Sequence, residues 1–153
     1  MKRLFFVLMT VVGLFASCEG PAGRDGLDGA ETYWFVKVYT INTNDWRLIN
    51  GVDRLGSYYE AKISIKELDK DLYEKGLVSC YMFQRTNNNV EVQTPLPFTL
   101  PYGKATGGNQ EELWTETYSF EYSPGSITFY VYYSDFYTSN RPPSTSFRVV
   151  LNY

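Results

Sequence analysis

From residue 32 onward, the chain repeats short runs that are rich in tyrosine, phenylalanine, valine, isoleucine and threonine. Clusters of glycine, proline, asparagine and aspartate separate these runs, a pattern typical of strands joined by turns. The pattern has no βαβ spacing. It predicts an all-β fold, an antiparallel β-sandwich of immunoglobulin-like or jelly-roll topology, with a barrel as the alternative. The predicted strands cover residues 33–41, 46–49, 57–65, 77–85, 90–94, 96–100, 113–122, 126–133 and 145–152.

Several of these runs alternate apolar and polar residues, which gives each strand one apolar and one polar face. Strands of this kind belong to antiparallel sheets that are covered on one face only. Lys37 and Arg148 are among the residues predicted to face outward. The sets predicted to face inward are Trp34, Val36 and Val38; Tyr59, Ala61, Ile63 and Ile65; and Phe147, Val149 and Leu151.

A helical rhythm is found over residues 66–75, where Leu68, Leu72 and Tyr73 recur among alternating charges. Gly76 follows as a typical C-terminal stop. The segment is short, so we expect at most one short helical turn in the domain.

Two further segments have a simple structural interpretation. Residues 103–108 are rich in glycine but lack the strand-to-helix context of a phosphate loop, and they predict a hairpin loop. Cys80 lies within the apolar run 78–83, which predicts a buried thiol rather than a nucleophile.

The N-terminus has the pattern of a secretory signal, because Lys2 and Arg3 precede the uncharged and mostly large apolar residues 4–16. As a helix this stretch would reach only about 20 Å, whereas a bilayer core is about 30 Å thick. A permanent transmembrane helix is therefore the poorer interpretation. We interpret residues 1–17 as a signal peptide.

Residues 14–18 read Leu-Phe-Ala-Ser-Cys and resemble the lipobox of bacterial lipoproteins. Phe15 departs from the leucine that this family most often has three positions before the cysteine. The resemblance implies that the chain is cut before Cys18 and that the Cys18 thiol carries a diacylglycerol, which anchors the protein to a membrane. The alternative is an ordinary secretory signal that is cut near Ala16 or Ser17.

Four consecutive Gly-X-Y triplets occupy residues 20–31. The period matches collagen, but four triplets are too few to offset the chain entropy of a triple helix. We interpret residues 18–31 as the lipidated cysteine and a hydrophilic spacer, which extends by roughly 3 Å per residue. Residues 32–153 have a length that makes a single β-sandwich domain.

The cysteine, the segment Gly-Pro-Ala-Gly-x-Asp-Gly-x-Asp-Gly and the tyrosine-rich β domain together resemble a group of small Bacteroidetes lipoproteins that are sometimes labelled collagen-like. The resemblance is specific for residues 14–31 and looser beyond, where Trp46, residues 95–102 and residues 147–150 match. It implies a lipid anchor in the outer membrane of a Gram-negative bacterium, on the periplasmic or the cell-surface side. It implies no activity.

Charge and the absence of histidine argue against several function classes. Without residues 1–17 the chain has a formal net charge of −5, so we expect no nucleic-acid partner. With no histidine, the usual general base and the commonest metal ligand are missing, and no residue set indicates a metal or a cofactor. We assign no catalytic residue. The carboxylate pairs that a glycosidase could draw on are Glu111–Glu112, Glu116–Glu121 and Asp69–Asp71.

Aromatic rings in or beside loops have less packing to explain them, which favours Tyr102, Trp114 and Tyr137 as candidate ligand-binding residues. A ladder on one face, made by the rings of residues 118–122 and 130–137, is explained as well by sheet stability alone. The sequence therefore predicts a membrane-anchored, non-catalytic β-sandwich that binds a glycan or a protein partner, or has a structural role in the envelope. The alternative is a carbohydrate-active enzyme that uses a carboxylate pair.

Overall fold

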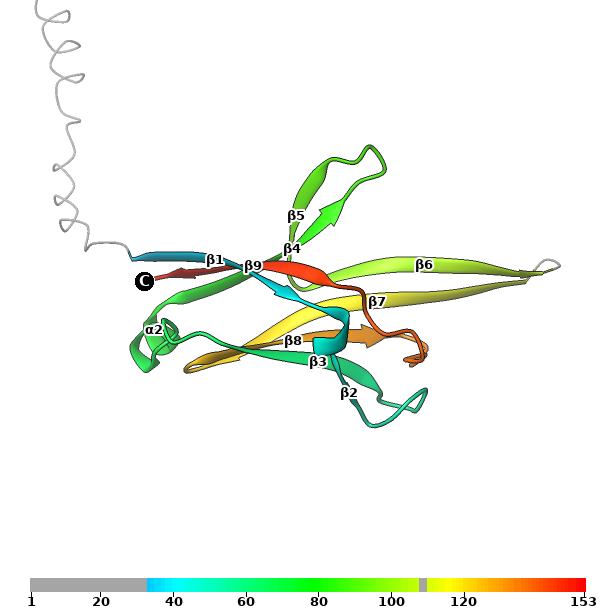
Figure 1. The fold of residues 1–153 in the computed structure, drawn as a ribbon, viewed down its shortest axis with the longest axis horizontal. Coiled ribbons are helices and arrows are strands. Elements are labelled where there is room, and N and C mark those ends of the chain that lie inside the picture. The colour runs from blue at the N-terminus through cyan, green and yellow to red at the C-terminus, as the bar shows by residue number, and fades with distance from the viewer. Residues whose placement is uncertain (1–32, 108–109) are drawn as a thin grey trace, which may run out of the picture. The chain divides into compact units, whose positions relative to one another are not determined.

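A computed structural model describes residues 33–107 and 110–153, so the predicted signal peptide, Cys18 and the spacer lie outside the described residues. Within the described residues, nine strands form two antiparallel sheets that face each other (Figure 1). This confirms the predicted all-β fold and the antiparallel β-sandwich. The strands are β1 (Trp34–Ile41), β2 (Arg47–Ile49), β3 (Tyr58–Ser64), β4 (Leu77–Arg85), β5 (Glu91–Pro95), β6 (Phe98–Gly107), β7 (Gln110–Ser123), β8 (Ser126–Tyr133) and β9 (Thr145–Asn152).

Strands from the two ends of the chain pair with each other in both sheets. One sheet has the order β1-β9-β4-β5 and the other has the order β2-β3-β8-β7-β6. The first strand therefore pairs with the last, and β3 pairs with β8. Immunoglobulin constant domains instead pair the first strand with the second, in the order ABED. The pairing of β1 with β9 and of β3 with β8 is thus closer to a jelly roll, one of the two predicted topologies. β4–β5 and β6–β7 are local hairpins.

Helical structure is short in the described part of the chain. The helix α2 (Lys70–Lys75) lies within the predicted segment, and the Asp69 carboxylate caps it by accepting a hydrogen bond from the backbone of Leu72 at 2.9 Å. Gly76 ends the helix, as predicted, by donating its N–H to the carbonyl of Leu72. A single 3₁₀ turn, η1 (Thr43–Asp45), was not predicted from the sequence.

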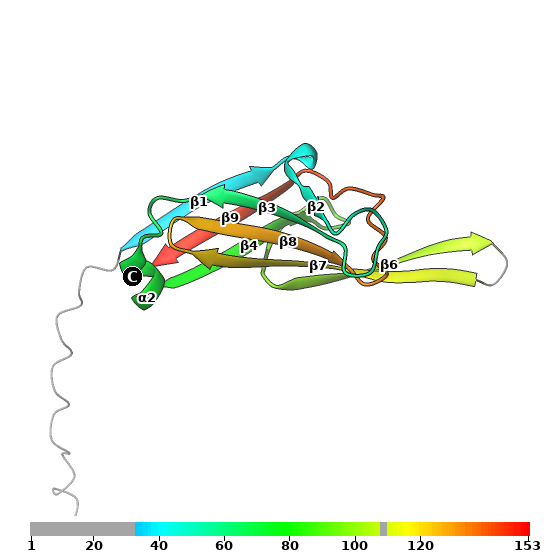
Figure 2. The same cartoon turned by 90° about the horizontal axis from the view of Figure 1, so that it is seen from below.

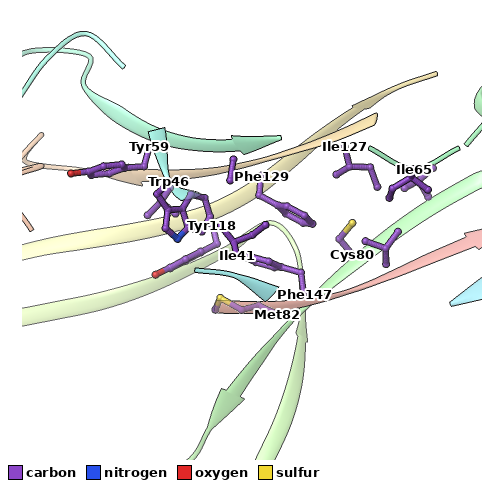
Figure 3. Packing of buried hydrophobic residues seen from close by; sticks show 14 of the residues in the cluster. Ile41, Trp46, Tyr59, Ile65, Cys80, Met82, Tyr118, Ile127, Phe129 and Phe147 are labelled. Atoms are coloured by element: carbon purple, nitrogen blue, oxygen red, sulfur yellow. The ribbon is translucent and has the colours of Figure 1, made fainter. Parts of the chain in front are cut away.

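The core lies between the sheets and is built around stacked aromatic rings. Phe129 of β8 and Phe147 of β9 stack across the two sheets with ring centroids 4.1 Å apart, and both side chains are fully buried (Figure 3). Trp46 meets Phe147 edge-on at 6.3 Å. The predicted inward sets of β3 and β9 are confirmed, since Tyr59, Val149 and their alternate neighbours face this core.

In β1 the prediction was wrong by one residue. Trp34, Val36 and Val38 are 61%, 48% and 49% exposed, whereas Ile41 is buried and Phe35 and Tyr39 are packed against the core. The cause is the register with β9, which places inward residues of β9 directly opposite the odd-numbered residues of β1. Directly opposed residues share a face of the sheet, so the neighbouring strand sets the orientation of β1.

Lys37 consequently lies on the core-facing side of the edge strand β1, with its ammonium group 5.0 Å from the ring centroid of Tyr39. An inward-pointing charge on an edge strand discourages pairing with another chain.

The predicted loop at residues 103–108 was also wrong. Residues 103–107 continue β6, and β7 begins at Gln110, so the hairpin is much longer than the predicted strands 96–100 and 113–122. Figures 1 and 2 show that this β6–β7 hairpin extends beyond the other strands. Glycine has a low strand propensity, and cross-strand pairing with β7 overrides it here.

Candidate functional site

The inner face of the β6–β7 hairpin continues the core face of its sheet. Tyr118 pairs with Phe98 and is buried, whereas Trp114 pairs with Tyr102, which is 39% exposed. Since side chains two residues apart on a strand point to the same face, a single row of side chains runs from the core into solvent. The place where this row emerges is the base of the extended hairpin.

At this place the surface forms a hollow of about 580 Å³, called the hairpin hollow below. Three segments contribute to it: the inner face of β6–β7, the end of β8, and the loop of residues 134–144 that joins β8 to β9. Its size is that of a small-molecule site. The residues that line it are Lys104, Glu112, Leu113, Trp114, Glu116, Tyr133, Asp135, Tyr137 and Asn140.

The structure brings the three candidate aromatic residues to this one place. Tyr102 and Trp114 are direct cross-strand partners, and their rings stack with centroids 5.6 Å apart and planes 14° apart. Tyr137 is 52% exposed and lines the hollow together with Trp114, while Tyr102 supports the Trp114 ring from β6. Tyr102, which was expected beyond the end of its strand, belongs to β6, whereas Trp114 lies in β7 within the predicted strand 113–122.

Tyr137 belongs to a loop that distant residues hold in place. The Asp53 carboxylate accepts hydrogen bonds from the backbone of Thr138 at 2.6 Å and of Ser139 at 2.8 Å, and from the Ser139 hydroxyl. The hydroxyl of Tyr59 donates to the carbonyl of Thr138 at 2.6 Å. The loop is thus tied to β3 and to the loop before β3, which fixes one wall of the hollow.

Glu116 is a half-buried carboxylate on the inner face of β7, directly opposite Tyr133. Burial raises its pKa above the ordinary value, and the nearby charge of Asp135 adds to this rise. Hydrogen bonds from Trp114 and Tyr118 act in the opposite sense; the Tyr118 hydroxyl lies 3.4 Å from Oε2. Both of these partners are neutral donors.

The predicted carboxylate pair Glu116–Glu121 does not assemble. Glu116 faces inward, whereas Glu121 lies on the outer face of the same strand and accepts a hydrogen bond from Tyr130 at 3.0 Å. Asp69 caps α2, and Asp71 pairs with Lys75 on that helix. The side chain of Glu111 lies outside the described residues. The sequence did not reveal that Glu116 and Asp135 line the same hollow. Their proximity depends on the register between β7 and β8 and on the conformation of the loop after β8, and neither can be predicted from the sequence.

The proposed aromatic ladder divides between the two faces of its sheet. Tyr118 and Tyr133 point inward, whereas Tyr130 and Tyr132 stack on the outer face with centroids 5.9 Å apart. Tyr58 joins the outer pair, 5.1 Å from Tyr132. These outer rings support one another across β3 and β8, which a purely structural role explains.

Other chemistry is sparse in the part of the chain that the structure describes. Cys80 is 2% exposed, which confirms the predicted buried thiol, and burial raises its pKa to about 12. Among residues 33–107 and 110–153, no three cysteine, aspartate or glutamate side chains group in a way that could hold a metal ion. None of the described helices has the length and apolar character that crossing a membrane requires.

Comparison with known proteins finds no matching family, no matching curated protein and no matching solved structure. The hairpin hollow itself therefore carries the functional argument.

Proposed function

We propose that this protein is an envelope lipoprotein, anchored through Cys18, whose β-sandwich binds a glycan in the hairpin hollow. The observation that carries the binding proposal is the stacked pair Tyr102–Trp114, which presents the Trp114 ring to a hollow also lined by Tyr137. Binding needs no catalytic group.

A sugar suits this hollow better than a protein partner does. A pyranose has an apolar C–H face that packs on an aromatic ring and a rim of hydroxyl groups that need hydrogen bonds. The hollow offers ring faces together with polar groups of Asn140, Asp135 and Lys104 around them. A standard protein interface covers about 800 Å² per partner, which is more than such a concave site offers, whereas concavity favours a small ligand.

The anchor and the spacer fit a binding role. A diacylglycerol with a further acyl chain would hold the protein on a membrane, since each buried methylene contributes about 0.8 kcal/mol. Roughly a dozen extended spacer residues would let the domain reach about 40 Å from the lipid. We place the anchor in the outer membrane of a Gram-negative bacterium, which would present the domain to envelope glycans.

The test is a binding survey with the full-length protein in detergent micelles on an array of bacterial and plant oligosaccharides. Positive ligands are then measured by calorimetry with Trp114→Ala and Tyr137→Ala, which should each weaken binding at least about tenfold, because each removes a ring from the site. Trp34→Ala is the matched control, since Trp34 is exposed on the other sheet. Binding that survives both site variants, or site variants that unfold the domain, would contradict the proposal.

A second candidate function is a carbohydrate-active enzyme. The observation that favours it is that Glu116, with its raised pKa, and Asp135 line the same hollow, as a general acid and a second carboxylate would. Incubation of each array ligand with the protein, followed by chromatography, decides between the two functions. Cleavage that Glu116→Gln abolishes would establish an enzyme, whereas binding without cleavage supports the binding module.

A further inference from the structure

The hairpin hollow is lined by more acidic than basic groups. Glu112, Glu116 and Asp135 contribute carboxylates, and Lys104 contributes an ammonium group. Lys104 lies opposite Glu112 across the β6–β7 ladder, one row further out than Trp114. The inner part of the hollow, next to the Trp114 ring, therefore carries carboxylates without a facing cation among its described lining residues.

The lack of a facing cation matters most for Glu116, because its carboxylate is half-buried. Of the ion pairs formed within the described residues, none includes Glu116; they are Arg47–Glu60, Lys70–Glu74 and Lys75–Asp71. Its partners are the neutral donors of Trp114 and Tyr118. A half-buried carboxylate without a cation costs free energy, and a bound cation would lower that cost.

A depression beside α2 makes a useful comparison, because it also combines aromatic rings with carboxylates. It is lined by Tyr73, Glu74, Phe120, Glu121 and Tyr122. There, however, Lys70 faces Glu74 at 3.7 Å and the Tyr130 hydroxyl donates to Glu121. Glu74 thus has a cationic partner, and Glu121 is exposed to solvent, so neither is a half-buried carboxylate without a cation.

We propose that the glycan bound in the hairpin hollow carries a free, protonated amino group, which binds the Glu116 carboxylate beside the Trp114 ring. This inference rests on the proposed function, since it specifies the sugar that the same site binds. Both neighbours favour a cation: the carboxylate by charge, and the indole face by its negative quadrupole. Acetylation of the amine removes the charge and therefore the basis of both interactions.

The experiment compares four ligands by calorimetry with the full-length protein in detergent micelles, at about pH 6, where amino groups are protonated. They are a glucosamine tetramer with free amines, the corresponding N-acetylglucosamine tetramer, cellotetraose, and Nα-acetyl-lysine amide. The free-amine tetramer should bind at least about tenfold more tightly than the other two oligosaccharides, as expected for a charge-assisted hydrogen bond. Glu116→Gln should remove this preference, so that the free-amine tetramer binds no more tightly than the N-acetylglucosamine tetramer.

Glu121→Gln is the matched control, because it removes a carboxylate from the outer face of the same strand and should keep the preference. Since acetylation tests the charge from the ligand side, the comparison holds even where a Glu116 variant fails to fold. Equal affinity for the three oligosaccharides overturns the inference but leaves the proposed function standing. Binding of none of the three overturns the inference, whereas the proposed function is decided by the oligosaccharide array. A lysine derivative that binds as tightly as the free-amine tetramer overturns the assignment of a sugar.

Discussion

Asp53 and Thr138 hold each other through two reciprocal hydrogen bonds, although they are far apart in the sequence. The backbone N–H of Thr138 donates to Oδ1 of Asp53 at 2.6 Å, and the backbone N–H of Asp53 donates to the Thr138 hydroxyl at 2.9 Å. Asp53 has a positive φ of 51°, a conformation that aspartate tolerates better than most residues. The pair joins the loop before β3 to the loop that carries Tyr137, and so connects a turn to a wall of the hairpin hollow.

The first prediction concerns Asp53→Asn. Hydrogen bonds from Ser139 and Thr138 lower the pKa of Asp53 below its ordinary 3.8. The ionised carboxylate therefore stabilises the fold fully above about pH 4, and this stabilisation is lost as the pH falls through the lowered pKa. The melting temperature of Asp53→Asn should be below that of the wild type at neutral pH, and the gap should close toward pH 2.

Thermal melts across this pH range make the measurement, with Glu91→Gln on β5 as the control for loss of an exposed carboxyl. A gap between wild type and Asp53→Asn that stays constant down to pH 2 would contradict the role of the charged form. Glycan affinity should also fall in Asp53→Asn, because the loop that positions Tyr137 is less tightly held.

The strands were predictable because alternation and turn residues are local signals. Residues 57–65 and 145–152 each have one apolar and one polar face, and the structure keeps both assignments. β1 failed because both of its faces carry large apolar residues, such as Phe35 on one and Val36 on the other. Local alternation then leaves the phase undetermined, and the register with β9 decides it.

The candidate site was predictable only in part. Tyr102, Trp114 and Tyr137 could be chosen from the sequence as rings beside turn residues, and the fold places them together. The roles of Glu116 and Asp135 in the hollow could not be predicted. Whether Glu116 faces inward depends on the phase of β7, and the position of Asp135 depends on loop contacts with residues near 53.

The second prediction tests the corrected phase of β1 within a single strand. Ile41 is 4% exposed, so Ile41→Ala should lower the free energy of unfolding by about 2–5 kcal/mol. Val38 is 49% exposed on the opposite face, so Val38→Ala should change it by about 0.5 kcal/mol or less. Urea titrations measure the free energy of unfolding of both variants, provided that the m-value is unchanged. If Val38→Ala destabilises the fold more than Ile41→Ala does, the inward face of β1 is the one predicted from the sequence.

The third prediction concerns the thiol of Cys80. Because burial raises its pKa to about 12, the thiolate is scarce near neutral pH, and the side chain is also inaccessible. In a Cys18→Ala chain, Ellman's reagent at about pH 8 should react with the native protein negligibly, and with one thiol per chain after unfolding in urea. Rapid reaction of a full equivalent in the native state would show that this part of the core opens readily.

The fourth prediction tests the anchor. Cells that express the wild-type protein and are fed a palmitate analogue should incorporate label into it, and Cys18→Ala should abolish both the labelling and the retention in membranes. Cys80→Ala is the matched control and should keep the label, since its thiol lies inside the domain. Equal labelling of wild type and Cys18→Ala would place the lipid elsewhere or remove it altogether.

The fifth prediction follows from the surroundings of Glu116. Several titratable or charged groups lie close enough to influence it or line the same hollow, and none of them except Lys104 is a cation at neutral pH. From β6, β7, β8 and the loop after β8, they are Tyr102, Lys104, Glu112, Tyr118, Tyr133, Asp135 and Tyr137.

Binding of a permanently charged ligand isolates the titration of the protein, and an N-trimethylated glucosamine tetramer is such a ligand. Its affinity should fall as the pH falls through the pKa of Glu116, because protonation removes the attracting charge. Since that pKa is raised from the ordinary 4.5, the loss of affinity should begin at a higher pH than exposed carboxylates would give, and reach about tenfold.

Calorimetry between about pH 7 and pH 4 should show this fall in affinity for the wild type. Glu116→Gln should bind this ligand more weakly at neutral pH, and its affinity should vary less than that of the wild type over this pH range. Cellotetraose carries no charge, so its affinity for the wild type should not show the fall. If wild type and Glu116→Gln lose affinity in parallel, another carboxylate holds the cation.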